Sequence, residues 1–149
     1  MDSTGATPRF MTREEIEDLL GLEVPAHLAT IDPDGYPRIT PIWFLWENGA
    51  FYMTSVEDKI QLRNLHRNPA ASVSVDIESP DSGKGYRSNR QVKAKGAVRL
   101  FKDDGSWTRR ITLKYLSGPE AERMADARAA MLRLVIELRT DDLVGLAAH

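Results

Sequence analysis

The sequence contains no cysteine among its 149 residues. This absence excludes disulfide bonds, thiolate nucleophiles and cysteine-ligated zinc. No apolar run approaches the roughly 18 residues that a membrane-spanning helix needs, and the first residues show neither the basic nor the apolar region of a secretion signal. We therefore expect a cytoplasmic protein that is not embedded in a membrane.

An excess of charge of one sign is also missing. The 20 Lys and Arg residues nearly balance 22 Asp and Glu residues, for a formal net charge of −2. Such a balance gives no general attraction to nucleic acid or to an anionic membrane, so any anion site must be local. The length predicts one domain, over residues 11–149, that follows a flexible arm at residues 1–10.

Motifs of several enzyme classes are absent as well. His27, His66 and His149 do not have the spacing of metal ligands, and we predict no metal site. The chain contains no Walker loop, no GxGxxG motif and no Ser-His-Asp order. No motif therefore supports a hydrolase or a dinucleotide-binding Rossmann fold.

The residue pattern predicts short helices around many strands. Thr12 and Glu15 fit a capping box that begins a helix ending at Gly21. We expect strands over residues 26–31, 38–46, 51–55, 71–77, 91–101 and 131–138, and helices over residues 58–68, 107–116 and 120–128. A loop is expected at residues 79–89, and residues 141–146 are expected to trail off the last strand. Because strands and helices do not alternate as βαβ units, the pattern favours a mainly β fold, an antiparallel barrel with peripheral helices.

Several short motifs follow one another in a characteristic order. They are Arg-Ile-Thr-Pro-Ile-Trp at 38–43, Phe-Tyr-Met-Thr-Ser at 51–55, Lys59, Asn68-Pro69, and Arg90-Gln91-Val92 leading to Gly96. In this series the chain resembles the pyridoxamine 5′-phosphate oxidase superfamily, whose members share a flavin-binding split barrel. The resemblance implies a split β-barrel homodimer that binds a flavin or deazaflavin phosphate at the dimer interface.

The chain also departs from the oxidases proper. Where they carry a Ser-Arg-Lys run, this chain has Glu57-Asp58-Lys59, so an acid replaces one basic phosphate ligand. Their C-terminal segment that binds the vitamin phosphate is not evident after Leu138, and we do not expect oxidation of vitamin B6. The run at 63–65 and the Ala- and Arg-rich helices look more like a small actinobacterial branch, many of whose members use the deazaflavin coenzyme F420. We therefore favour F420 over FMN as the cofactor.

The candidate phosphate site lies where a strand ends and a helix begins. Thr54 and Ser55 end the strand, and the free N–H groups and positive end of the following helix favour an anion. Lys59 adds a mobile cation, and Arg63 extends this basic face toward the acidic tail of F420. The alternatives are that Lys59 and Arg63 are solvated surface residues, and that Thr54 and Ser55 only cap the strand end.

The candidate ring site lies on the strand before it. Arg38 is placed either beside an anionic or carbonyl partner or, in the alternative, on the outer, solvated face of its strand. The resemblance implies that the strand carrying Pro41, Ile42 and Trp43 faces the reactive edge of the ring, although an aromatic residue there is often part of the core. Gln91 has an amide that suits a ring carbonyl, or it lies on an exposed strand face.

These residues predict an oxidoreductase that transfers hydride between F420 and a small unsaturated or oxidised substrate. We name no side chain as a general acid. The alternatives are an FMN-binding flavoprotein of the same superfamily, a flavin or F420 carrier or sensor without turnover, and a ligand-binding barrel without redox chemistry.

Overall fold

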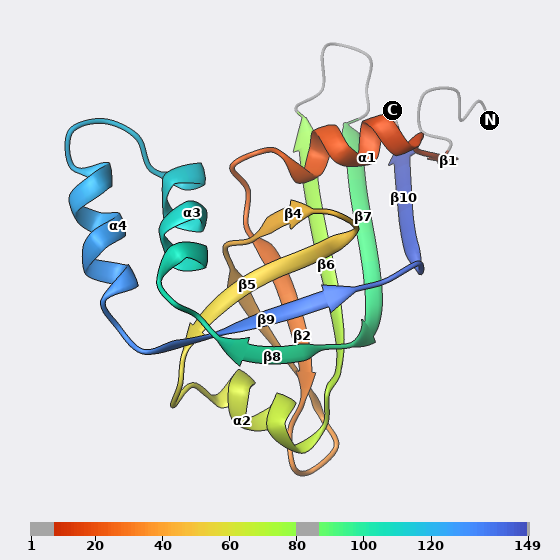
Figure 1. Cartoon of the computed structure of the whole chain (residues 1–149). Coiled ribbons are helices and arrows are strands. Elements are labelled where there is room, and N and C mark those ends of the chain that lie inside the picture. The colour runs from red at the N-terminus through yellow and green to blue at the C-terminus, as the bar shows by residue number, and fades with distance from the viewer. Residues whose placement is uncertain (1–7, 80–86, 149) are drawn as a thin grey trace.

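The computed structural model describes residues 8–79 and 87–148, which form a split β-barrel of two antiparallel sheets (Figure 1). The larger sheet contains, in spatial order, β1 (Arg9–Phe10), β10 (Leu143–Ala148), β7 (Ser88–Ala97), β6 (Ala70–Ser79), β2 (Ala26–Ile31) and β3 (Pro37–Ile42). The smaller sheet contains β4 (Leu45–Glu47), β5 (Ala50–Val56), β9 (Arg133–Arg139) and β8 (Arg99–Lys102). The expected mainly β, antiparallel split barrel is confirmed.

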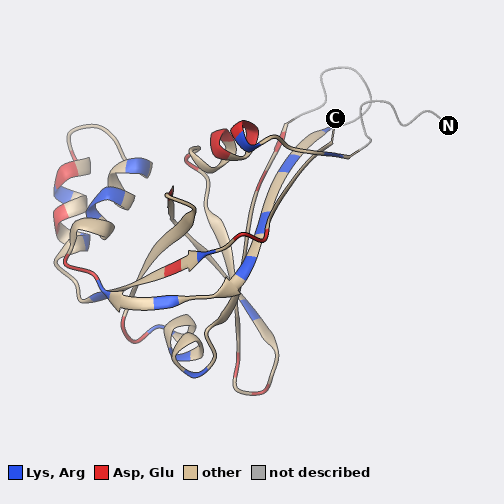
Figure 2. Ribbon diagram, turned by 45° about the vertical axis from the view of Figure 1, so that its right-hand side comes forward, with Lys and Arg blue, Asp and Glu red and all other residues tan. Residues whose placement is uncertain are grey.

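Helices cover the ends and one side of this barrel (Figure 1). The helix α1 (Arg13–Leu20) lies near the ends of β6, β7 and β10, whereas α2 (Ile60–Arg67) lies at the opposite end of the barrel. The helices α3 (Ser106–Tyr115) and α4 (Ala121–Ala129) pack side by side, and they carry both acidic and basic side chains (Figure 2). Among the described residues, no helix is long and apolar enough to cross a membrane.

The predicted capping box of α1 is confirmed. The Thr12 hydroxyl accepts a hydrogen bond from the Glu15 N–H at 3.1 Å, and the Glu15 carboxylate accepts one from the Thr12 N–H at 2.9 Å. These two bonds satisfy N–H groups that a helix start leaves without partners. The apolar stripe of α1 then buries Ile16, Leu19 and Leu20 against the barrel.

Two strands that the sequence predicts as continuous are each divided between the sheets. The strand expected at 38–46 breaks at Trp43-Phe44, so that β3 lies in the larger sheet and β4 in the smaller one. The strand expected at 91–101 breaks at Val98 into β7 and β8. In each case the chain turns a barrel corner, where one strand passes from sheet to sheet.

Both ends of the chain contain more strand structure than expected. The segment at 141–146 does not trail off β9, because Leu143–Ala148 form β10 and pair with β7. The last residues of the expected arm, Arg9–Phe10, form β1 and pair with Ala147 and Leu146. Of the loop expected at 79–89, Ser79 ends β6 and Ser88 begins β7, while residues 80–86 lie outside the described part of the chain.

Candidate functional site

The strand β3 forms an open edge of the larger sheet, because its neighbour in that sheet is β2 alone. The Asp32 N–H donates to the Tyr36 carbonyl at 2.8 Å, and this bond fixes which residues of β3 point their backbone groups at β2. By this alternation, the outward backbone groups are those of Pro37, Ile39 and Pro41. Proline has no N–H and is suited to such an edge. The edge therefore offers three carbonyl groups and the single N–H of Ile39.

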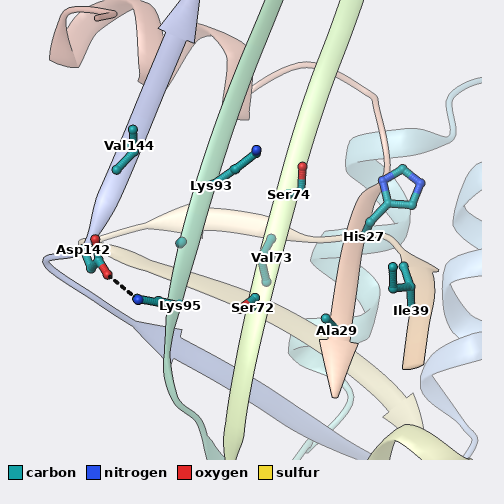
Figure 3. A pocket seen from close by; sticks show the side chains of 11 residues that line it. His27, Ala29, Ile39, Ser72, Val73, Ser74, Lys93, Lys95, Asp142 and Val144 are labelled. Atoms are coloured by element: carbon teal, nitrogen blue, oxygen red, sulfur yellow. Dashed lines mark ion pairs between the residues drawn. The ribbon is translucent and has the colours of Figure 1, made fainter. Parts of the chain in front are cut away.

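A hollow of about 470 Å³ lies on the outer face of the larger sheet (Figure 3). Its lining comes from five elements or their ends: His27 and Ala29, Ile39, Ser72, Val73 and Ser74, Lys93, Ala94 and Lys95, and Asp142 and Val144. Lys95 and Asp142 form an ion pair of 3.9 Å at one edge of it, away from His27 and Ile39 (Figure 3). The side chain of Ile39 is 66% exposed, so this face presents apolar as well as basic groups to a ligand or a second chain.

A second hollow, also of about 470 Å³, continues from the end of β3. It is lined by Pro25, Pro41, Ile42, Trp43 and Arg128. Pro41, Ile42 and Trp43, which are expected to form the wall beside a ring, all lie in this one hollow. Arg128, from the last turn of α4, is the basic residue that lines the same hollow.

The end of β5 and the start of α2 place several polar groups together. The hydroxyl of Ser55 is buried and accepts a hydrogen bond of 3.0 Å from the Gln61 side chain. Lys59 occupies the N-cap position of α2, where no side chain caps the helix, and the first turn contains no acid. Among the described residues, neither Lys59 nor Arg63 has an ion-pair partner, and both side chains are exposed. These two cations are available to an anionic ligand.

A network of polar contacts ties α2 to β2 and β3. The Arg38 guanidinium, which is exposed, donates to the Asp32 carboxylate at 2.8 Å, and the Asn64 amide donates to the same carboxylate at 2.8 Å. The hydrogen bond from Arg38, together with that from Asn64 and the charge of Arg67, lowers the pKa of Asp32 below its usual value. Arg38 therefore has a partner within its own chain, and it lies on the α2 side of its strand, opposite the outer face that carries Ile39.

Thr54 and Gln91 lie apart from this group. Thr54 is buried against α3, where its hydroxyl and that of Thr108 are 2.9 Å apart. Gln91 is half-buried on β7 and donates to the Asn89 side chain at 3.2 Å. Since β6 and β2 separate β7 from β3, Gln91 lies about 14 Å from β3 at the usual strand spacing. Their roles in binding stay predictions.

Sequence reasoning did not single out Arg128 or the lining of the outer-face hollow. Arg128 lies in a helix of alternating Ala and charged residues, a pattern typical of a solvated helix surface. Nothing in the sequence places α4 beside the end of β3, because that contact depends on the tertiary fold. Outward-facing lysines and serines of β6 and β7 likewise look like an ordinary exposed strand face.

Several solved structures have similar folds. An F420 reductase is 28% identical, with 85% of this chain and 94% of that protein covered and a TM-score of 0.63. An FAD-binding protein from Mesorhizobium loti is 20% identical, with 95% and 99% covered and a TM-score of 0.64. An FAD and heme binding protein from Mycobacterium smegmatis is 21% identical, with 95% and 73% covered and a TM-score of 0.71.

No curated protein sequence matches the chain. The model of one protein family does match, and it does so over residues 12–142, from the N-cap of α1 to the residue before β10. The matched segment contains the β3 edge, the hollow at the end of β3, the basic start of α2 and the lining of the outer-face hollow except Val144. The chain therefore belongs to the pyridoxamine 5′-phosphate oxidase family.

Proposed function

We propose that this protein is an oxidoreductase that binds the deazaflavin coenzyme F420 and transfers hydride between it and a small unsaturated or oxidised substrate. The observation that carries the proposal is a pair of exposed cations, Lys59 and Arg63, which have no ion-pair partner within residues 8–79 and 87–148 and lie at the start of a helix that is tied to the open β3 edge. The 28% identity to an F420 reductase, over 94% of that protein, supports the same coenzyme.

The groups present fit the parts of a deazaflavin phosphate. Lys59 and Arg63 supply positive charge for the phosphate and the acidic tail, and the uncapped start of α2 adds free N–H groups. The carbonyls and the Ile39 N–H of the β3 edge are complementary to the polar edge of a ring. When bound, the deazaflavin supplies the hydride, and the protein supplies binding and orientation. Glu57 and Asp58, both exposed, oppose an anion at the preceding turn, so we assign the phosphate to Lys59 and Arg63.

The placement of Gln91 supports a site shared by two protomers. A ring held at β3 is out of reach of Gln91 in the same chain, because two strands lie between them. We propose a homodimer that pairs the outer faces of the two larger sheets and brings Gln91 of one protomer to the β3 edge of the other. The exposed apolar side chain of Ile39 on this face, 66% exposed, would then be covered.

A second candidate is a flavin-binding protein without turnover. It is favoured by the two structural relatives that bind FAD, one of which also binds heme. FMN would use the same phosphate site, since Lys59 and Arg63 do not distinguish one phosphate ester from another. Measurement of catalytic turnover, rather than of cofactor binding, distinguishes this binding protein from the proposed oxidoreductase.

The test is a fluorescence titration of the purified full-length protein with F420 and, separately, with FMN. We expect tighter binding of F420, with affinity reduced about tenfold in Lys59→Ala and in Arg63→Ala, because each removes one charge-assisted contact. Arg123→Ala is the matched control, since Arg123 is exposed and pairs with Glu120 on α4. Tighter binding of FMN would assign the protein to the flavin users, and binding of neither would refute the proposal.

Turnover is measured next, with reduced F420 and a panel of α,β-unsaturated carbonyl compounds. Loss of reduced F420 that depends on both protein and substrate supports an oxidoreductase. Tight binding of F420 with no turnover on any member of the panel favours the carrier or sensor.

A further inference from the structure

Arg128 lines the hollow at the end of β3. The other arginines of α3 and α4 all have an acidic partner: Arg109 pairs with Glu122 and Asp126, Arg110 with Glu47, and Arg123 with Glu120. Arg128 alone among these four forms no ion pair within the described residues.

The guanidinium of Arg128 is nevertheless held in one place. Its central carbon lies over the ring of Trp43, 4.8 Å from the ring centroid, and its Nη1 donates to the Thr112 hydroxyl at 2.9 Å. Trp43 in turn stacks on Tyr115. Two constraints therefore fix the side chain, and a positioned guanidinium loses less conformational entropy when it binds a ligand.

The environment of Arg128 favours an anion. Burial lowers the pKa of Arg128, and the positive charge of Arg133 lowers it further. The Nε of Arg133 donates to the Arg128 carbonyl at 3.3 Å, so that a second half-buried guanidinium lies close by. A partly desolvated cation beside another cation is unfavourable, and an anionic ligand would relieve both costs.

Two donors of Arg128 remain available. Its Nη1 is occupied by Thr112, while its Nε and Nη2 make no hydrogen bond within the described part of the chain. Nε and Nη2 together form the side-on fork that binds both oxygens of a carboxylate. The rest of the hollow, Pro25, Pro41 and Ile42, is apolar and suits the hydrocarbon body of such a ligand.

We propose that Arg128 is the carboxylate-binding residue of the substrate pocket, and that the substrates are small apolar, unsaturated monocarboxylates. The carboxylate pairs with Nε and Nη2 of Arg128, and the unsaturated body lies against Pro41 and Ile42. This assignment rests on the proposed function, which places the reactive edge of the coenzyme ring beside the same segment of β3.

The probes are cinnamate and its neutral analogue cinnamamide, titrated into the full-length protein by calorimetry, with and without its coenzyme. We expect cinnamate to bind at least tenfold more tightly than cinnamamide, because only the acid forms the charge-assisted pair. This comparison uses the unaltered protein and does not depend on a variant that folds. Equal affinity for the two probes, or no binding of cinnamate, would overturn the inference.

Variants then identify the residue. Arg128→Gln is expected to reduce cinnamate affinity at least tenfold and to leave cinnamamide affinity unchanged, and Arg128→Lys is expected to restore part of the loss. Arg123→Gln, on the same helix, is the matched control and should change neither affinity. Unchanged cinnamate binding in Arg128→Gln would refute the role of Arg128, whether or not the oligomeric state changes.

The two proposals fail separately. If F420 binds and cinnamate does not, the inference about Arg128 fails and the proposed function stands. If cinnamate binds through Arg128 but neither F420 nor FMN binds, the carboxylate site stands and the redox function fails.

Discussion

The ring of Trp43 stacks on the ring of Tyr115, with centroids 4.6 Å apart and planes only 6° from parallel. Tyr115 also fixes the chain around this tryptophan, because its hydroxyl donates to the Val24 carbonyl at 2.8 Å and accepts from the Phe44 N–H at 3.3 Å. The Lys114 ammonium donates to the Phe44 carbonyl at 3.0 Å. Helix α3 thereby holds the corner at which the chain leaves β3 and enters β4.

Removal of the Tyr115 hydroxyl tests how much this corner depends on hydrogen bonds. In Tyr115→Phe the ring stack remains, but the Val24 carbonyl and the Phe44 N–H lose a partner. We expect the free energy of unfolding to fall by about 1–2 kcal/mol, the usual cost of such losses. Urea denaturation measures the change. Tyr36→Phe is the control, since Tyr36 is 71% exposed, and a loss of the same size in the control would contradict the interpretation.

The pH dependence of stability tests the burial of Lys114 and Tyr115. Burial lowers the pKa of Lys114 from 10.5 to about 8, and burial raises the pKa of Tyr115 from 10.0 to about 12. Between pH 8 and 10.5 the unfolded chain binds more protons at Lys114 than the folded chain, so the free energy of unfolding should rise with pH. Between pH 10 and 12 the unfolded chain loses the Tyr115 proton first, so stability should fall.

Urea denaturation at pH 7–11 measures this profile, and we expect a maximum near pH 10. Lys114→Met should abolish the rise above pH 8, whereas Lys102→Met, at an exposed position of β8, should preserve it. A rise that persists in Lys114→Met would show that another group is responsible.

Asn64 is expected to be essential for the contact between α2 and the β2–β3 hairpin. It is only 1% exposed; its amide donates to the Thr30 hydroxyl at 3.1 Å and the Asp32 carboxylate at 2.8 Å, and its carbonyl accepts from Arg67 at 2.9 Å. Asn64→Ala removes all three hydrogen bonds, although Asp32 keeps Arg38 and Arg67 keeps the Ile31 carbonyl, and we expect a loss of about 2–3 kcal/mol in the free energy of unfolding.

Arg63→Ala, one position earlier on α2, provides the contrast. Its side chain is exposed and makes no hydrogen bond or ion pair within the described residues. We expect its stability to change by less than about 0.5 kcal/mol, while its affinity for the coenzyme falls. Thermal unfolding of both variants separates the structural residue from the binding residue. Equal destabilisation would contradict this division.

The sequence predicts the β2 strand and the α1 cap well, because short-range patterns determine them. It does not show where strands change sheets. Ile42, Phe44 and Trp46 all face the core, so the period-2 alternation continues through the break at residue 43. The same holds for Val92, Ala94, Val98 and Leu100 across the break at residue 98. Because a barrel strand keeps one face inward as it turns the corner, hydrophobic alternation contains no signal for the turn.

The candidate site, like the fold, is predictable only where its residues lie close together in the sequence. Lys59, Arg63 and the segment 41–43 follow from motifs that are local in sequence, and the structure brings 41–43 to one hollow. The partner of Arg38 is also close in sequence, since Asp32 lies across a single hairpin. Arg128 depends instead on how α4 packs against the end of β3, and Thr54 on how α3 packs against β5. Such helix placements on the outside of a barrel are tertiary contacts that no local pattern encodes.

The missed strand β10 leads to a last prediction, because two of its three inward-facing residues, Gly145 and Ala147, are too small to give a hydrophobic signal. Gly145 lies on β10 where α1 crosses it, and a Cβ atom there would be 2.7 Å from Cγ1 and 2.9 Å from Cδ1 of Ile16. Gly145→Ala should therefore force α1 away from the sheet and lower the free energy of unfolding by about 1–3 kcal/mol.

Gly21→Ala is the matched control, because a Cβ atom there would approach nothing closer than 3.5 Å and the backbone is already in the right-handed helical region. Urea denaturation of both variants provides the comparison. Gly145→Ala should cost less in an Ile16→Ala background than in the unaltered protein, because Ile16→Ala removes both Cγ1 and Cδ1 and leaves room for the added methyl group. If Gly145→Ala is as stable as Gly21→Ala, α1 does not pack on β10 as closely as the structure shows.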